Sequence, residues 1–134
     1  LLHKSEQRTI SPAICVYIDA NGLHELNNER WHEAGDLMLR FVAESLMEQF
    51  PKGSLYRVGG DEFVVFPAPA EGQTCEDRMR SASASITAQG YSISYGIAAH
   101  ESVVGLRELV READEKMLES KRAYYAEHDH RVRK

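Results

Sequence analysis

Two adjacent glycines, Gly59 and Gly60, separate two apolar runs and restrict the possible folds more than any other feature of the chain. The first run ends with residues 55–56, Leu-Tyr, and the second is 63–66, Phe-Val-Val-Phe. Glycine tolerates positive φ, which the favoured turns of tight β-hairpins require. The pattern therefore predicts two antiparallel strands that meet at a tight glycine turn, over residues 54–66.

Two acids, Asp61 and Glu62, follow the glycines at the tip of this predicted hairpin. Carboxylates at the mouth of a buried hairpin are costly unless a cation or a hydrogen-bonding ligand satisfies them. The alternative is a solvated turn, since glycine and aspartate are common in turns. Taken alone, the hairpin leaves both interpretations open.

Length and composition favour one globular domain, with 134 residues of which 43% are hydrophobic and 28% charged. The formal net charge of −5 argues against a protein that holds nucleic acid on a basic face. We expect no signal peptide, because residues 1–4 are followed at once by polar residues, and no membrane contact by this domain, because apolar runs of bilayer length are missing. Cys15 and Cys75 are expected to be free thiols of a reducing compartment, so a cytoplasmic domain is predicted, even if the full-length protein is membrane-anchored.

The periodicity of apolar residues predicts the remaining elements. Helices are expected at 23–28, 33–50, 74–88 and 106–124, and strands at 13–20 and 91–98. The first strand is apolar on both faces, whereas the last has one face of small residues that would let a helix approach closely. Residues 1–12 are interpreted as a linker or a truncated N-terminal helix, and 127–134 as a tail that frays or forms a short strand. The order predicts an α+β fold with a central, mainly antiparallel sheet flanked by helices.

Asp19 ends the first predicted strand. If this strand and the hairpin are neighbours in one sheet, Asp19 and Asp61 converge at its edge. Two carboxylates with a nearby backbone carbonyl form an oxygen-only site that suits Mg²⁺. Two metals there could stabilise the attacking and leaving oxygens of phosphoryl or nucleotidyl transfer. The alternative is that Asp19 caps the helix that follows.

The segment after Asp19 contains candidates for holding a nucleotide. Gly22 would let the backbone approach a ligand closely, and successive amides through Leu23 can hold phosphate where a helix begins. Asn27 and Asp36 could read guanine, because a carboxylate accepts from its N1–H and 2-amino group and adenine lacks those donors. The alternatives are an ordinary turn glycine and residues common at helix ends and starts.

Residues 59–63, Gly-Gly-Asp-Glu-Phe, match the motif that names the GGDEF domains, the diguanylate cyclases. The chain resembles that family from about residue 15 to residue 121, in register and spacing, including the segments 18–28, 32–36 and 92–97. The resemblance implies that 1–134 is a single GGDEF domain. It also implies a fold like that of nucleotidyl cyclases and polymerase palms, with a ferredoxin-like core and the motif on a β-hairpin.

The resemblance further implies the reaction and the residues that perform it. A diguanylate cyclase condenses two GTP into cyclic di-GMP and releases pyrophosphate, in bacterial second-messenger signalling. The family uses two Mg²⁺ per active site, with Mn²⁺ as an alternative, acts as a homodimer and is commonly joined to an upstream sensor domain. Implied metal ligands are Asp19, the Ala20 carbonyl and Asp61; implied substrate-binding residues are Gly22, Leu23, Asn27, His32, Asp36 and Lys121, the last at the terminal phosphates. Asp61 and Glu62 are the implied catalytic residues, Glu62 as a base, as a metal neighbour or as the residue that orients the turn.

Three residues depart from the family pattern. His24 stands where the family usually has lysine, Trp31 replaces a glycine, and Tyr125 stands where a phosphate-binding arginine is usual. These departures motivate an alternative, a degenerate domain that binds GTP or nothing and acts as a regulatory or dimerising module without turnover. Asp36 is retained, which favours GTP over ATP.

Overall fold

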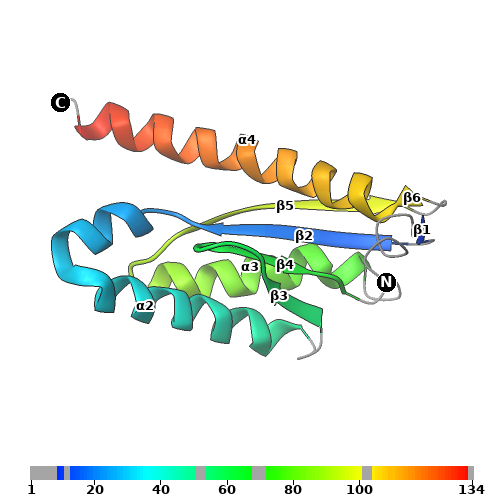
Figure 1. Ribbon diagram of the computed structural model, residues 1–134, viewed down its shortest axis with the longest axis horizontal. Coiled ribbons are helices and arrows are strands. Elements are labelled where there is room, and N and C mark those ends of the chain that lie inside the picture. Colours follow the sequence, from blue (N-terminus) through cyan, green and yellow to red (C-terminus); the bar gives the residue numbers. More distant parts are fainter. Residues whose placement is uncertain (1–8, 11–12, 51–53, 68–71, 101–103, 133–134) are drawn as a thin grey trace.

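The computed structural model of the chain describes residues 9–10, 13–50, 54–67, 72–100 and 104–132 (Figure 1). For residues 9–10, 13, 23–32, 72–74, 104 and 128–132 the backbone alone is described. The elements, in chain order, are β1 (Thr9–Ile10), β2 (Ala13–Ala20), α2 (Leu23–Gln49), β3 (Leu55–Arg57), β4 (Glu62–Val65), α3 (Gly72–Ala88), β5 (Ile93–His100), β6 (Val104–Gly105) and α4 (Leu106–Val132).

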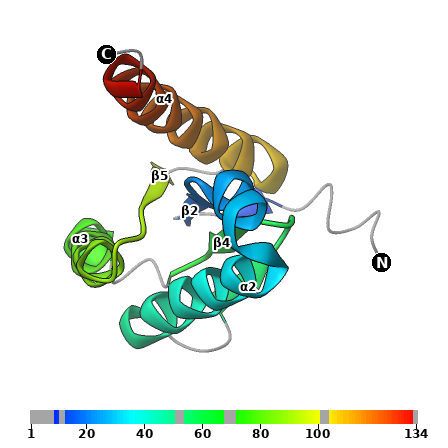
Figure 2. The same ribbon diagram turned by 90° about the vertical axis from the view of Figure 1, so that its left-hand side faces the viewer.

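Strand β2 lies inside an antiparallel sheet with the strand order β3-β4-β2-β5. It pairs with β4 on one side and with β5 over its whole length on the other, while β1 and β6 form a separate pair. Helix α4 covers one face of the sheet, and α2 and α3 lie on the opposite face (Figure 1, Figure 2). The predicted α+β fold, with a mainly antiparallel sheet flanked by helices, is confirmed.

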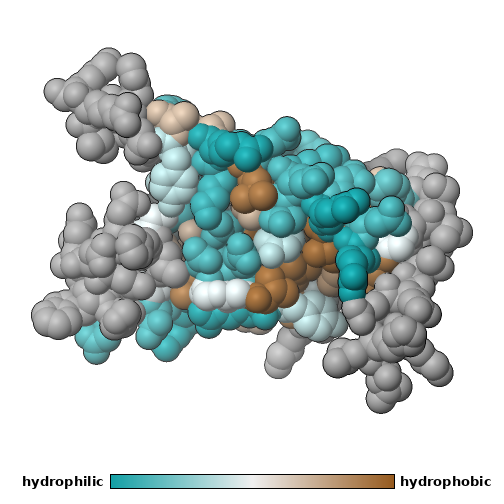
Figure 3. All heavy atoms as spheres, turned by 45° about the horizontal axis from the view of Figure 1, so that its top comes forward, coloured by the Kyte–Doolittle hydropathy of each residue, from teal (hydrophilic) through white to brown (hydrophobic). Residues whose placement is uncertain are grey.

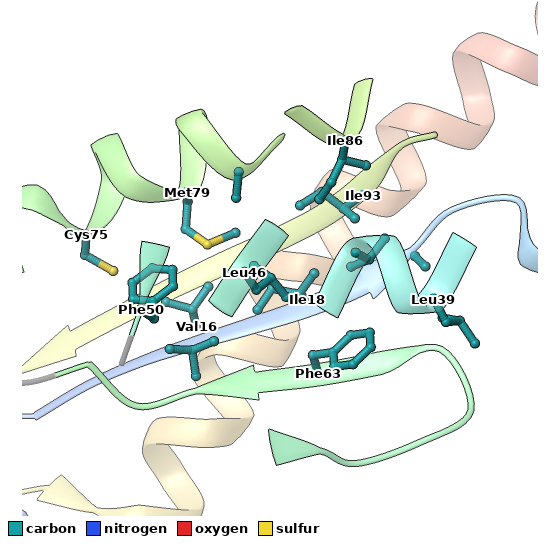
Figure 4. Close-up of a cluster of buried hydrophobic side chains, with 14 of the residues drawn as sticks. Val16, Ile18, Leu39, Leu46, Phe50, Phe63, Cys75, Met79, Ile86 and Ile93 are labelled. Carbon is teal, nitrogen blue, oxygen red and sulfur yellow. The ribbon is translucent and has the colours of Figure 1, made fainter. Parts of the chain in front are cut away.

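Successive side chains of β2 point to opposite faces of the sheet, and each face carries its own apolar cluster. Val16 and Ile18 point toward α2 and α3, where they join Leu46 and Met79 in the larger cluster (Figure 4). The smaller cluster consists of Cys15, Val64, Ala98, Leu109 and Ala113, on the face that α4 covers. The end of β2 is therefore fixed by burial on both sides, as its apolar pattern predicts.

Helix α4 is amphipathic. Leu109, Ala113 and Met117 recur at helical spacing and are all 0% exposed. The side of the molecule that carries α4 is mostly hydrophilic, with smaller apolar patches (Figure 3). Among the described residues, no helix combines the length and the apolar character that crossing a bilayer would need.

Helix α4 and strand β5 approach each other most closely at Gly96. A Cβ atom at this position would lie 2.4 Å from the Ala113 carbonyl oxygen and 2.4 Å from the Met117 amide nitrogen. The prediction that the small-residue face of this strand admits a helix is confirmed, since Ser94 and Ala98 on the same face are also buried.

Two predictions about helices are wrong. The separate helices expected at 23–28 and 33–50 are one element, α2, whose ribbon bends sharply in its first part (Figure 1). No proline interrupts that span, and the single glycine at position 35 is tolerated inside a helix. The tail expected at 127–134 to fray or to form a short strand is helical in its described part: α4 continues to Val132, and this segment contains neither glycine nor proline.

The hairpin is confirmed, but its turn differs from the one predicted. β3 and β4 pair with Tyr56 opposite Val64. Four residues, 58–61, connect the strands, and neither Gly59 nor Gly60 has positive φ. The longer connection spreads the reversal over more residues, so mirror-image turn torsions are not needed. The Arg57 guanidinium donates to the carbonyl oxygens of Gly59 and Gly60, at 3.2 and 2.5 Å.

We predict that Gly96→Ala lowers the free energy of unfolding by about 1–3 kcal/mol, because the new methyl group overlaps backbone atoms of α4. Gly60→Ala is the matched control, since a Cβ there meets nothing within 4 Å, and it should change stability by less than about 0.5 kcal/mol. Urea unfolding followed by circular dichroism measures both. Equal effects of the two substitutions would contradict the close approach.

We also predict that both cysteines resist alkylation in the folded protein at pH 8. Cys15 and Cys75 are 0% and 1% exposed, and burial raises the pKa of Cys15 from 9.0 to about 12. The thiolate is the reactive form, so iodoacetamide should label the folded chain far more slowly than the urea-unfolded chain. Because the folded pKa of Cys15 exceeds the unfolded one, ionisation favours unfolding above pH 9 and labelling should accelerate there. Rapid labelling of folded protein at pH 8, read by mass spectrometry, would contradict this placement.

Candidate metal and nucleotide site

Pairing of β2 with β4 brings three carboxylates together. Asp19 lies opposite Glu62 in the register, and the Ala20 amide donates to the Asp61 carbonyl oxygen at 2.9 Å. One carboxylate oxygen from each of Asp19, Asp61 and Glu62 lies within 4.8 Å of the others. The structure thus brings Asp19 and Asp61 to one end of the sheet, as the sequence predicts. Carboxylate oxygens at this spacing suit a hard divalent cation.

Asp19 is the buried member of this acidic cluster, 0% exposed. Its Oδ2 accepts a hydrogen bond from the Lys121 ammonium of α4, whereas Oδ1 has no hydrogen-bond partner among the residues described. Burial raises the pKa of Asp19 to about 6, helped by the charge of Asp61 and opposed by Lys121. A buried carboxylate oxygen without a partner is costly, and a bound cation would satisfy it.

The alternative role of Asp19 as a helix cap does not hold. The N-cap residue of α2 is Gly22, which has no side chain to cap the helix. Asp19 instead points to the face that α4 covers, where it meets Lys121. Burial disfavours the charge on Lys121, but its hydrogen bond and attraction to Asp19 outweigh this and raise the pKa of Lys121.

Tyr17 orients the third carboxylate. Its hydroxyl donates to Glu62 Oε1 at 3.0 Å, which leaves Oε2 for a ligand. Burial, and then this hydrogen bond, raise the pKa of Tyr17, so the phenol stays protonated at neutral pH. The sequence analysis missed Tyr17, although the period of two along β2 places it on the same face as Asp19.

A hydrogen-bonded turn follows β2. Asn21 is 4% exposed; its amide nitrogen donates to Ser92 Oγ at 3.0 Å and its amide oxygen accepts from Ser94 Oγ at 2.9 Å. Gly22 then adopts φ 77° and ψ 10°, a left-handed conformation that favours glycine. Its amide donates to the Tyr125 hydroxyl at 2.9 Å. These contacts with Ser92 just before β5, with Ser94 on β5 and with Tyr125 on α4 were not predicted, since the sequence shows no pattern that pairs them.

The candidate guanine end of the site is described in part. Asp36 is exposed and borders a groove of about 560 Å³ between α2 and the hairpin, together with Leu39, Arg40, Arg57 and Phe63. Its volume falls in the range of small-ligand pockets. Leu23, Asn27 and His32 lie on the part of α2 whose side chains are outside the description, so their roles, like that of the Ala20 carbonyl, stay predictions.

The family model "Diguanylate cyclase, GGDEF domain" matches residues 1–126, and the chain therefore belongs to the GGDEF family. The diguanylate cyclase DgcS of Shewanella oneidensis is 29% identical over 122 residues, which cover 86% of this chain and 41% of that protein. The signaling protein YkoW of Bacillus subtilis is 33% identical over 64 residues, 47% of this chain and 8% of that protein. The chain thus spans less than half the length of these curated relatives.

Solved structures of GGDEF domains share the fold. The GGDEF domain of TpbB, also called YfiN, from Pseudomonas aeruginosa superposes with a TM-score of 0.73 at 27% identity, covering 84% of this chain and 73% of that one. A microbial GGDEF domain studied for its interaction with cyclic di-GMP gives a TM-score of 0.74 at 25% identity, with 84% and 74% covered. The acidic cluster Asp19, Asp61 and Glu62 is consistent with the Mg²⁺ chemistry of this family.

We predict that Mg²⁺ stabilises the protein through this cluster. At ten times its dissociation constant, the ion should add about 1.4 kcal/mol to the free energy of unfolding and raise the midpoint of thermal unfolding by a few degrees. Asp19→Asn should remove the shift. Asp77→Asn should keep it, because Asp77 is an exposed acid on α3 whose partner is Arg80. A Mg²⁺ shift of equal size in the Asp19 variant, measured by calorimetry, would exclude Asp19 as a ligand.

Proposed function

We propose that this chain is the catalytic domain of a diguanylate cyclase that condenses two GTP into cyclic di-GMP. The observation that carries the proposal is the acidic cluster of Asp19, Asp61 and Glu62 in a chain of the GGDEF family, with a buried oxygen of Asp19 that has no partner among the residues with described side chains. In each half of the reaction, the 3′-hydroxyl oxygen of one GTP bonds to the α-phosphorus of the other. The bond from that phosphorus to the bridging oxygen breaks, and pyrophosphate leaves with its electron pair.

The residues of the cluster have separate tasks in this proposal. Asp19 and Asp61, with the Ala20 carbonyl, hold Mg²⁺, and Glu62 Oε2 is available to the same ion or to the proton of the attacking hydroxyl. Two Mg²⁺, or Mn²⁺, would neutralise phosphate charge and favour the ionised 3′-hydroxyl when bound. Tyr17 holds Glu62 in one orientation, so the carboxylate needs little reorganisation during the reaction.

The rest of the nucleotide is assigned to the residues around the turn after β2. The amides of Gly22 and Leu23 are proposed to bind phosphate, and Lys121 to contact the terminal phosphates from α4. Asn27, His32 and Asp36 are proposed to hold guanine, with Asp36 accepting from N1–H and the 2-amino group. Asp36 borders the groove between α2 and the hairpin, which supports this end of the assignment.

Catalysis on this scheme requires two copies of the chain, because each copy holds one GTP and the nucleotides must face each other. We propose a homodimer in the cytoplasm, controlled by a sensor domain elsewhere in the full-length protein. Holding the two nucleotides in reacting geometry would supply much of the rate.

A second candidate function is a GTP-binding or dimerising regulatory module without turnover. The observation that favours it is the hydrogen bond between the Gly22 amide and Tyr125, at a position proposed for phosphate. Binding of GTP without formation of cyclic di-GMP, at protein concentrations that saturate dimerisation, would select this function over the cyclase.

We predict that Asp61→Ala lowers formation of cyclic di-GMP from GTP and Mg²⁺ by roughly 100-fold or more, because it removes a carboxylate from the cation site. The far-ultraviolet circular dichroism should stay unchanged, since Asp61 lies in a turn and is not part of the core. Asp77→Ala on α3 is the control and should retain full activity. Chromatographic detection of product at the wild-type rate in the Asp61 variant would reject the proposed metal site.

A further inference from the structure

In the part of helix α4 whose side chains are described, two of them contact the candidate site. Its C-terminal half extends past the end of β2 (Figure 1). Lys121 and Tyr125, four residues apart, share one face of the helix. Lys121 meets Asp19, and the Tyr125 hydroxyl accepts a hydrogen bond from the Gly22 amide at 2.9 Å. Lys121 therefore contacts a proposed metal ligand, and Tyr125 contacts an amide that is proposed to bind phosphate.

The Tyr125 contact is held in place by its surroundings. Tyr125 is half-buried, and its ring meets the ring of Tyr124 edge to face, with centroids 5.0 Å apart and planes at 89°. Gly22, its partner, is fixed in turn by the neighbouring Asn21, which is buried and bonded to Ser92 and Ser94. Both ends of this hydrogen bond thus have a defined position.

One amide hydrogen makes one strong hydrogen bond. A phosphate oxygen bound to Gly22 would need to lie about 2.9 Å from its nitrogen, where the Tyr125 oxygen now lies. Both oxygens cannot occupy that position. Three residues earlier, Oδ1 of Asp19 has no hydrogen-bond partner in the described part of the chain, which independently indicates a cation or a hydrogen-bond donor as a ligand at this end of the sheet.

We propose that Tyr125 competes with the terminal phosphates of GTP for the Gly22 amide and so weakens binding of the triphosphate selectively. This inference rests on the phosphate site assigned above to Gly22. Tyr125 is a specificity-determining residue on this account: it acts against nucleotides whose phosphates reach Gly22, and leaves shorter ones unaffected. Guanosine monophosphate, which lacks the terminal phosphates, is the natural comparison.

The test uses Tyr125→Phe, which removes the hydroxyl and keeps the ring. Isothermal titration with Mg²⁺ compares 3′-deoxy-GTP, which cannot react, with guanosine monophosphate. The variant should bind the triphosphate roughly two- to tenfold more tightly, the worth of one ordinary hydrogen bond, and the monophosphate unchanged. Tyr56→Phe is the matched control, because Tyr56 is 53% exposed on β3, and it should change neither affinity.

A second variant, Tyr125→Arg, should bind the triphosphate more tightly still, because it adds a cation while freeing the amide. Unchanged or weaker triphosphate binding by Tyr125→Phe would overturn the inference. So would an equal gain for both nucleotides, which would indicate ring packing as the cause.

Product formation from GTP separates this inference from the proposed function. If Tyr125→Phe gains affinity for the triphosphate but no variant forms cyclic di-GMP, the inference stands and the cyclase proposal fails. If the wild type forms cyclic di-GMP but Tyr125→Phe gains no affinity, the cyclase proposal stands and the inference fails. Absence of triphosphate binding in the wild type and in both Tyr125 variants would reject both.

Discussion

The buried carboxylate of Asp19 is the feature on which the rest of the site depends. A charge at the end of a strand covered on both faces is unfavourable without compensation, and burial accordingly raises its pKa to about 6. Lys121 compensates one oxygen, and the other has no partner among the described residues. One oxygen of Asp19 is thus compensated by a residue of the last helix, and the other oxygen is suited to bind a cation. Asp19 therefore takes part both in the packing of the fold and in the candidate cation site.

The sheet register explains why the remaining acids lie beside Asp19. Because β4 pairs antiparallel with β2, the turn that precedes β4 lies beside the end of β2, and Glu62 lies directly across from Asp19. Apolar residues at alternate positions keep this register, since a slip by one residue would turn Val16 and Ile18 away from the core. The packing of the core therefore positions the carboxylates of the candidate site. The hydrogen bond from Tyr17 then orients Glu62.

The sequence predicted those parts of the molecule that leave a periodic signal. The bounds of β2, the hairpin and the meeting of Asp19 with Asp61 followed from alternation, glycine placement and the motif at 59–63. The contacts of Tyr17 and Tyr125 did not, because a hydrogen bond between residues 45 or 103 positions apart has no local signature. The single span of α2 and the full length of α4 were missed because both continue through polar stretches where the apolar periodicity is weak.

The close contact at Gly96 has a mechanical consequence for α4. Backbone atoms of Ala113 and Met117 lie so near β5 that this part of the helix cannot slide without breaking the packing. Beyond it, side-chain hydrogen bonds join the helix to the end of β2 through Lys121 and to the turn after β2 through Tyr125. α4 is thus held most closely to the sheet where it passes Gly96. A tilt of the helix beyond this point would break the contact of Lys121 with Asp19 and the hydrogen bond of Tyr125 with the Gly22 amide together.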